Sequence, residues 1–354
     1  MRKAFAIILC ILSLAGISIA PPATAAMSTW LVDMNSIEGV LRWINNYRNK
    51  PDPTAIPPIV QALSRLGAFK DPEQAGAYTG FIAGVIRANP RNAEDMISKM
   101  LPLPVGDQWV IVRAIAYSGH PDWQNLLRRV ADKIPTRRVM IDKYLAGQLP
   151  TLWQIPLDQK PSTWETVRYY VTFENLWGET PAKEVVLGSS PELLDTLWGY
   201  YFATSAQRPI ARIVAMLPMS RDNDTIEKLT IGSMAKYTLA TNAARDLALL
   251  EMLKQMRLRQ PKLEAAILGD VISAAETAEV ARLRKDALAA IDELRRKGPG
   301  YRRTVSIWGQ IGTGALALGC IAAAATGHIE LGLPCIITGG VSSAAVGLWE
   351  KQQP

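Results

Sequence analysis

Apolar side chains recur with helical spacing through the middle of the chain. Residues three and four apart share one face of an α-helix, so each such stripe predicts a helix with a buried face. No run alternates apolar and polar residues between turn signals, and we therefore expect an all-α protein without sheets. The stripes are Tyr78, Phe81, Ile82, Val85 and Ile86; Trp123, Leu126, Leu127 and Val130; Leu194, Leu197, Trp198 and Tyr201; Ile210, Ile213, Val214 and Leu217; and Leu249, Met252, Leu253 and Met256.

Capping residues and prolines indicate where these helices begin and end. Asp71-Pro72-Glu73 and Ser190-Pro191-Glu192 each place an N-cap residue before a proline and an acidic residue, which suits the first turn of a helix. Proline cannot continue a helix, so proline dipeptides predict helix ends. These dipeptides are Asn89-Pro90, Ile134-Pro135, Leu217-Pro218 and Gln260-Pro261.

The prolines of those four dipeptides recur at intervals of about 43 residues or about twice that, a period typical of stacked helix pairs. Two segments, AIAYSGHPDWQNLLRRVADKIP and YYFATSAQRPIARIVAMLP, share one order: small residues, a proline, and an apolar helix that ends in proline. The pattern predicts an α-solenoid of helical hairpins over residues 27–261.

From Pro53 to Pro261 the chain loosely resembles the HEAT-like and TPR-like classes of helical-repeat protein, although it does not match the TPR consensus. The segment Asp195–Ser205 (DTLWGYYFATS) resembles a phrase of exported bacterial helical proteins of unknown function. These resemblances imply a helical-repeat fold and no activity.

A long helix is predicted after the repeats. Only Gly269 interrupts the helix-forming residues from Lys262 to Lys297, which at 1.5 Å per residue give a rod of about 50 Å. Gly298-Pro299-Gly300 then forms a hinge, so residues 262–300 read as a stalk. A basic cluster follows the rod and suits contact with anionic lipid headgroups: Arg295, Arg296, Lys297, Arg302 and Arg303.

Two uncharged runs, Val305–Ala325 and Leu331–Trp349, follow the hinge. Each has about the length that crosses a bilayer, and Trp308 and Trp349 suit its interface. Residues 301–350 therefore predict a C-terminal two-helix transmembrane hairpin. Its many glycines allow close packing within the hairpin or in a homo-oligomer. Residues 312–317 match G-x-G-x-x-A but lack the preceding strand and downstream acid of a dinucleotide site, so we assign no cofactor.

The N-terminus predicts export. Arg2 and Lys3 precede an apolar run and then PPATAA, the order of a secretory signal over residues 1–26 with cleavage after Ala25 or Ala26. The alternative is an uncleaved anchor. Export places the helical domain in the periplasm, anchored to the inner membrane. The basic residues at 295–303 favour the opposite side of the membrane, but long domains translocate largely regardless of charge.

Charge and cysteine content narrow the function classes. A formal net charge of +7 on 354 residues is only mildly basic, which argues against a nucleic-acid partner. Cys10, Cys320 and Cys335 all lie outside the predicted helical domain, which therefore offers no disulfide, thiol nucleophile or thiolate ligand.

Candidate chemistry is sparse. His120 and His328 lie in separate predicted turns, so no metal site is expected. Ser233 and Lys236 have the S-x-x-K spacing of an acylating pair, but the S-D-N and K-T-G motifs that accompany it elsewhere are missing. We therefore expect no enzyme, and we assign no catalytic, cofactor-binding or metal residue.

The aromatic stretch 149–198 offers the strongest case for an enzyme. Trp153, Trp164, Trp177, Tyr169 and Tyr170 could stack on sugars, and Glu165, Glu174 and Glu179 could cleave a glycan. Glu165 and Glu174 point to opposite sides of one helix, which weakens the case for cleavage. The sequence thus favours a membrane-tethered scaffold that binds a protein partner, with a periplasmic glycan-binding or glycan-cleaving protein as the alternative and a self-assembling pore or oligomer as a minor option.

Overall fold

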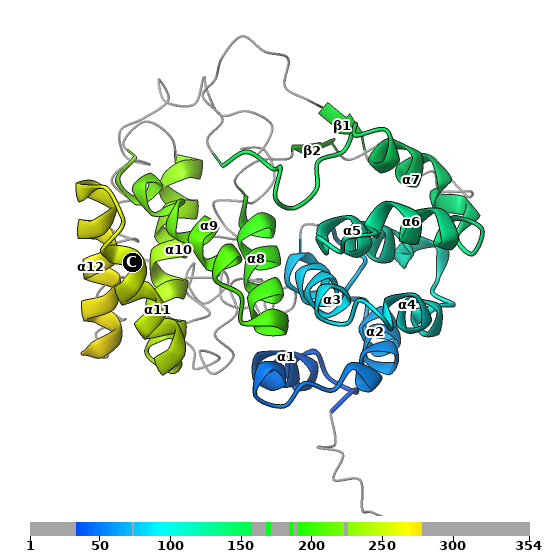
Figure 1. Ribbon diagram of the computed structural model, residues 1–354, viewed down its shortest axis with the longest axis horizontal. Coiled ribbons are helices and arrows are strands. Elements are labelled where there is room, and N and C mark those ends of the chain that lie inside the picture. The colour runs from blue at the N-terminus through cyan, green and yellow to red at the C-terminus, as the bar shows by residue number, and fades with distance from the viewer. Residues whose placement is uncertain are drawn as a thin grey trace, which may run out of the picture. The chain divides into compact units, whose positions relative to one another are not determined.

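The computed structural model describes residues 33–72, 74–157, 168–170, 184–186, 190–222 and 226–277. Over these residues the chain is helical, as the apolar stripes predict (Figure 1). The exception is an antiparallel ribbon of two three-residue strands, β1 (Arg168–Tyr170) and β2 (Glu184–Val186), which the sequence pattern did not predict. The ribbon pairs Tyr169 with Val185 and lies between the seventh and eighth helices in chain order.

The helices follow one another along the chain, and their connections are short except for the long one, residues 146–190, between α7 and α8. The α-helices are α1 (Ile37–Asn46), α2 (Ile56–Arg65), α3 (Gly76–Ala88), α4 (Ala93–Met100), α5 (Trp109–Tyr117), α6 (Trp123–Ala131), α7 (Arg138–Leu145), α8 (Pro191–Thr204), α9 (Gln207–Val214), α10 (Ile226–Ala243), α11 (Leu247–Arg257) and α12 (Lys262–Glu276). Short 3₁₀ turns lie between them: η1 (Tyr47–Asn49), η2 (Pro53–Ala55), η3 (Val105–Asp107), η4 (Pro135–Arg137) and η5 (Leu217–Arg221).

Three helix pairs, α3–α4, α5–α6 and α8–α9, share one design. The first helix is buried nearly all round: every residue of α5 is buried, and so are α3 and α8 apart from their ends. The second helix has eight or nine residues and buries one face, as α6 does with Leu126, Leu127 and Val130. A proline follows each second helix, at Pro102, Pro135 and Pro218. Each pair therefore combines a core helix with a helix that presents its polar face outward.

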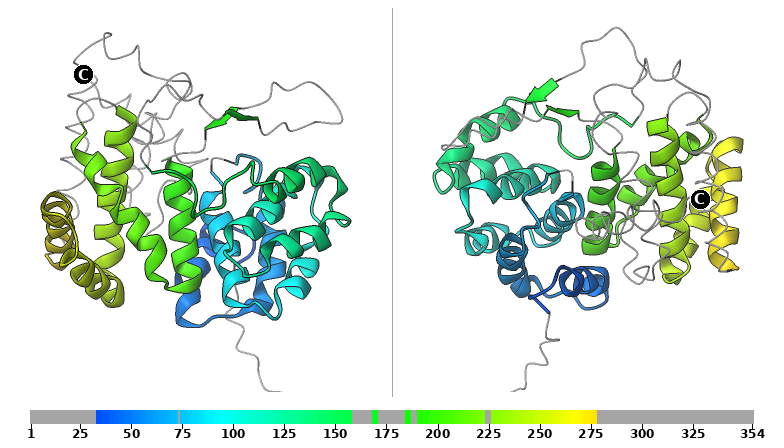
Figure 2. Two further views of the ribbon diagram at one scale, coloured as in Figure 1. Left: turned by 45° about the horizontal axis from the view of Figure 1, so that its top comes forward. Right: turned by 180° about the vertical axis from the view of Figure 1, so that it is seen from behind.

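The helices α3 and α8, far apart in the sequence, pack directly against each other through glycines (Figures 1 and 2). A Cβ added at Gly80 would lie 1.9 Å from the carbonyl oxygen of Thr196, and one added at Gly199 would lie 2.0 Å from that of Ala77. Only glycine permits this approach, because real Cβ atoms do not come within 3.0 Å of such atoms. A solenoid in which repeats contact only their neighbours does not predict this long-range pairing.

The helix α10 lies on the other side of α8 from α3. Figures 1 and 2 show α8 between α3 and α10. The buried Trp198 of α8 donates from Nε1 to Oγ1 of Thr238 on α10, at 3.0 Å. Arg48, just after α1, forms an ion pair of 2.8 Å with Asp246, which also accepts a hydrogen bond of 2.8 Å from the hydroxyl of Tyr201. This cluster fastens the chain after α1 to α8 and to the start of α11.

Helix boundaries test the capping predictions. Ser190 is the N-cap of α8 and accepts a hydrogen bond of 3.0 Å from the backbone N–H of Leu193, as predicted. The prediction that a helix begins at Asp71 was wrong: α3 begins at Gly76, and the carbonyl of Asp71 closes a turn with the N–H of Gln74. The predicted end at Asn89-Pro90 is confirmed, with Asn89 as the C-cap of α3.

Several predicted segments lie outside the described residues. These are the signal 1–26, the part of the stalk 262–300 that follows Thr277, and the membrane runs Val305–Ala325 and Leu331–Trp349. The described part of the stalk is α12. Within the described residues, no helix combines the length and the apolar character that crossing a bilayer requires.

Candidate functional site

A buried ion pair joins α5 to the start of α8. Arg113, whose side chain is 3% exposed, reaches from α5 to the carboxylate of Glu192, with 2.5 Å between Nη1 and Oε1. Its guanidinium lies over the ring of Trp109, 4.7 Å from the ring centroid. Glu192 lies in the first turn of α8, where the helix dipole favours a negative charge. The pair therefore holds the start of α8 against α5.

Two tyrosines complete this cluster. The rings of Tyr117 on α5 and Tyr144 on α7 meet edge to face, with centroids 6.5 Å apart. Burial raises the pKa of both hydroxyls, and the charge of Arg113 opposes that rise in each. Burial has the largest single effect on the pKa of Arg113 and acts to lower it, but Glu192, Tyr117 and Tyr144 together raise that pKa overall. The arginine therefore stays charged and the tyrosines stay neutral near pH 7.

One further acid lies one helical turn beyond Glu192. Asp195 is 2% exposed, and its Oδ1 has no hydrogen-bond partner. Burial, and then the charge of Glu192, raise the pKa of Asp195 well above its usual value. A buried carboxyl of raised pKa is a candidate general acid. However, α3 covers Asp195: a Cβ added at Gly76 would lie 3.1 Å from the Cβ of Asp195. The carboxyl therefore faces protein, and we assign it no catalytic role.

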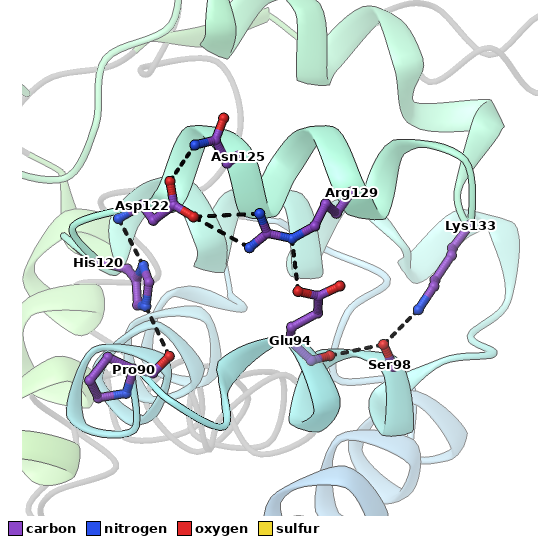
Figure 3. Close-up of polar contacts among 8 residues, drawn as sticks. All are labelled: Pro90, Glu94, Ser98, His120, Asp122, Asn125, Arg129 and Lys133. Atoms are coloured by element: carbon purple, nitrogen blue, oxygen red, sulfur yellow. Dashed lines mark hydrogen bonds and ion pairs between the residues drawn. The ribbon is translucent and has the colours of Figure 1, made fainter.

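His120 is engaged by the backbone. Its Nδ1 accepts a hydrogen bond of 3.0 Å from the N–H of Asp122, and its Nε2 lies 3.2 Å from the carbonyl oxygen of Pro90 (Figure 3). Since a carbonyl only accepts, Nε2 carries the proton in this arrangement. His120 is 7% exposed. His120 therefore ties the turn before α6 to the end of α3 and is not poised as a general base.

A network of polar side chains extends from this turn across α4 and α6 (Figure 3). Arg129 contacts Glu94 at 2.8 Å and Asp122 at 3.4 Å. Lys133 donates to the hydroxyl of Ser98 at 2.6 Å. Exposed ion pairs of this kind contribute only about 0–1 kcal/mol each, so the network does little for stability. It forms a surface of mixed charge across two neighbouring helix pairs, which we call the α4–α6 face.

The other sequence candidates also have partners within the fold. Lys236 pairs with Asp270 at 3.2 Å, and Ser233 is buried, so the S-x-x-K pair does not form an open nucleophile and base. Trp153 lies under the guanidinium of Arg208, at 4.2 Å, and against the ring of Tyr200.

Most of the remaining glycan candidates in the stretch 149–198 lie outside the described residues. Trp198 is fully buried. The side chains of Trp164, Trp177, Tyr169 and Tyr170, the acids Glu165, Glu174 and Glu179, and His328 lie outside what the structure describes. Among the described residues, no three His, Cys, Asp or Glu side chains group as metal ligands do.

The sequence analysis did not identify Arg113 or Asp195 as candidate functional residues. Arg113 interrupts the apolar run from Trp109 to Tyr117, and a lone charge in such a run is the signal of a buried ion pair. Asp195 is likewise a charged residue among buried apolar ones, since Leu194 and Leu197 lie beside it and α8 is buried on all sides. Comparison of the chain with protein-family models, with curated proteins and with solved structures finds no match.

Proposed function

We propose that this chain is a non-enzymatic, membrane-tethered helical-repeat scaffold that binds a protein partner at the bacterial cell envelope. The observation that carries the proposal is the repeated pair of a core helix and an outward-facing helix in α3–α4, α5–α6 and α8–α9. Such pairs supply a rigid core and a continuous outer surface, which is how helical repeats present binding faces.

The engagement of the reactive side chains supports a binding role over a catalytic one. His120 is held by two backbone groups, Lys236 by Asp270, and Arg113 by Glu192. Catalysis needs a group that reaches a substrate, and each of these groups instead joins two parts of the fold. Trp153 and Trp198, the tryptophans of the stretch 149–198 that the structure describes, are packed against neighbouring side chains and do not favour the glycan alternative.

The tether rests on the sequence. The signal-like residues 1–26 and the uncharged runs within 301–350 support an inner-membrane anchor with the helical domain in the periplasm. We assign the α4–α6 face to the partner, because it spans two helix pairs and its exposed charges of both signs can pair with complementary charges on a partner.

Site-specific photo-crosslinking in intact cells tests this assignment. A photoreactive amino acid replaces Asn125 or Lys133, both exposed residues of the network that forms the α4–α6 face, and Gln255 on α11 serves as the exposed control. We expect one discrete adduct from the first two positions and none from the control. Equal labelling at all three positions, or no adduct at any, contradicts the assignment.

A further inference from the structure

The turn between α11 and α12 exposes apolar side chains. Leu258, the C-cap residue of α11, is 79% exposed, which makes it the most exposed large apolar side chain among the described residues. Leu263, in the first turn of α12, is 46% exposed. Exposing one leucine is ordinary, but two on one tight turn need a reason.

Cations flank both leucines. Arg257, Arg259 and Lys262 are exposed, and the acid nearest to them in the sequence, Glu264, is half-buried. A helix dipole explains cations at the end of α11, but it disfavours Lys262 at the start of α12. The dipole also gives no reason for the exposure of Leu258. Apolar side chains among exposed cations are instead the composition of a segment that lies at the interface of an anionic bilayer.

The turn is held in shape by contacts within the fold. Arg257 donates from Nε to the carbonyl oxygen of Ala265, at 3.2 Å, which links the end of α11 to α12. Its guanidinium lies over Gly269, where an added Cβ would be 3.1 Å from Cζ. The two leucines therefore lie on a turn that is already ordered. Because little more of the chain has to become ordered when this turn binds a surface, binding loses little conformational entropy.

We propose that this tip, residues 257–263, docks on an anionic bilayer surface. The inference rests on the proposed membrane tether. The helix α12 has 15 residues, or about 22 Å at the helical rise. The 27 residues 278–304, at the same 1.5 Å per residue, would span about 40 Å, which is more than the length of α12. The chain after α12 is therefore long enough for the tip and the predicted membrane runs to contact one bilayer. The tip then fixes how the helical domain lies against the membrane.

Lipid quenching of a label on the tip tests the proposal. The full chain carries serine at Cys10, Cys320 and Cys335 and a fluorophore on Leu258→Cys, and is reconstituted into vesicles with or without anionic phosphatidylglycerol. The control is the same label on Val139→Cys, which is 64% exposed on α7. With anionic vesicles, we expect nitroxide lipids to quench the Leu258 label severalfold more than the Val139 label. Arg259→Gln with Lys262→Gln should remove most of that difference.

The possible outcomes distinguish a failure of the docking proposal from a failure of the proposed membrane tether. If the protein floats with vesicles but both labels are quenched alike, the tip does not dock and the tether stands. Equal quenching of the Leu258 label in anionic and neutral vesicles also overturns the anionic preference. If the protein floats with neither kind of vesicle, the proposed tether itself is wrong, and the inference about the tip falls with it.

Discussion

Replacing Gly80 by alanine should force apart the two helices at the centre of the fold. The new Cβ would lie 1.9, 2.7 and 2.8 Å from the O, C and Cα atoms of Thr196, whereas ordinary contacts begin near 3.4 Å. All three atoms are backbone, so no rotamer change relieves the clash. The α3 and α8 backbones must separate, and α8 must also keep its contacts with α9 and α10.

The expected loss of stability is about 3 kcal/mol. Overpacking a core costs about 1–3 kcal/mol and occasionally more, and this clash is with backbone atoms. Alanine regains about 1 kcal/mol of helix propensity over glycine, so the steric cost must exceed the observed loss. For domains of roughly 150–250 residues, each kcal/mol shifts Tm by about 2–4 °C, which predicts a fall of about 6–12 °C.

Thermal unfolding of the full chain in detergent, followed by far-ultraviolet circular dichroism, measures this loss. Gly106→Ala is the matched control, because Gly106 is exposed and has no atom within 4 Å of an added Cβ. Its Tm should stay within about 2 °C of the wild type, since surface substitutions change stability by about 0.5 kcal/mol or less. The reasoning is refuted if Gly80→Ala melts together with Gly106→Ala.

Three further experiments test the polar contacts and the buried acid. Arg113→Met should cost about 3–5 kcal/mol in urea unfolding because it breaks a buried pair, and adding Glu192→Met should recover part of that loss; additive losses would argue against the pairing. Tyr201→Phe should cost about 1 kcal/mol by removing the hydrogen bond to Asp246, whereas Tyr47→Phe, whose hydroxyl has no partner, should be neutral or stabilising; equal losses contradict this. Asp195 holds its proton in the folded state above the unfolded pKa of about 3.9, so wild-type stability should fall as pH rises from there toward the raised folded pKa. In Asp195→Asn, the urea midpoint of unfolding should vary less with pH between pH 5 and 9 than it does in the wild type. If the midpoints of the two proteins change with pH in parallel, the raised pKa of Asp195 is contradicted.

The all-α fold class could be predicted from the sequence, because a helix with one buried face needs apolar residues spaced three and four apart. The stripe Leu126, Leu127 and Val130 on α6 is buried as expected, and Ser190 caps α8 because its side chain accepts the N–H of Leu193. The same reasoning failed at Asp71, which has the residue types of a cap but closes a turn five residues before α3 begins. The capping residues alone do not decide at which of two nearby positions a helix begins, because tertiary packing favours one of them.

The long-range arrangement was harder to predict. Gly76, Gly80 and Gly84 recur every four residues and form one face of α3, a signal that a single sequence contains. Their partner Gly199 lies far along the chain, and spacing alone does not say which helix approaches. The two-stranded ribbon is too short to produce a readable alternation. Arg113 and Glu192 likewise carry no local sign that they meet.

The membrane topology of the chain tests the account most directly, because the scaffold is proposed to act outside the inner membrane. The chain with serine at Cys10, Cys320 and Cys335 carries Val139→Cys, 64% exposed on α7, and intact spheroplasts are treated with a membrane-impermeant maleimide. The account predicts full labelling before lysis, equal to that after lysis. Labelling only after lysis would place the helical domain in the cytoplasm and contradict the export on which the proposed function depends.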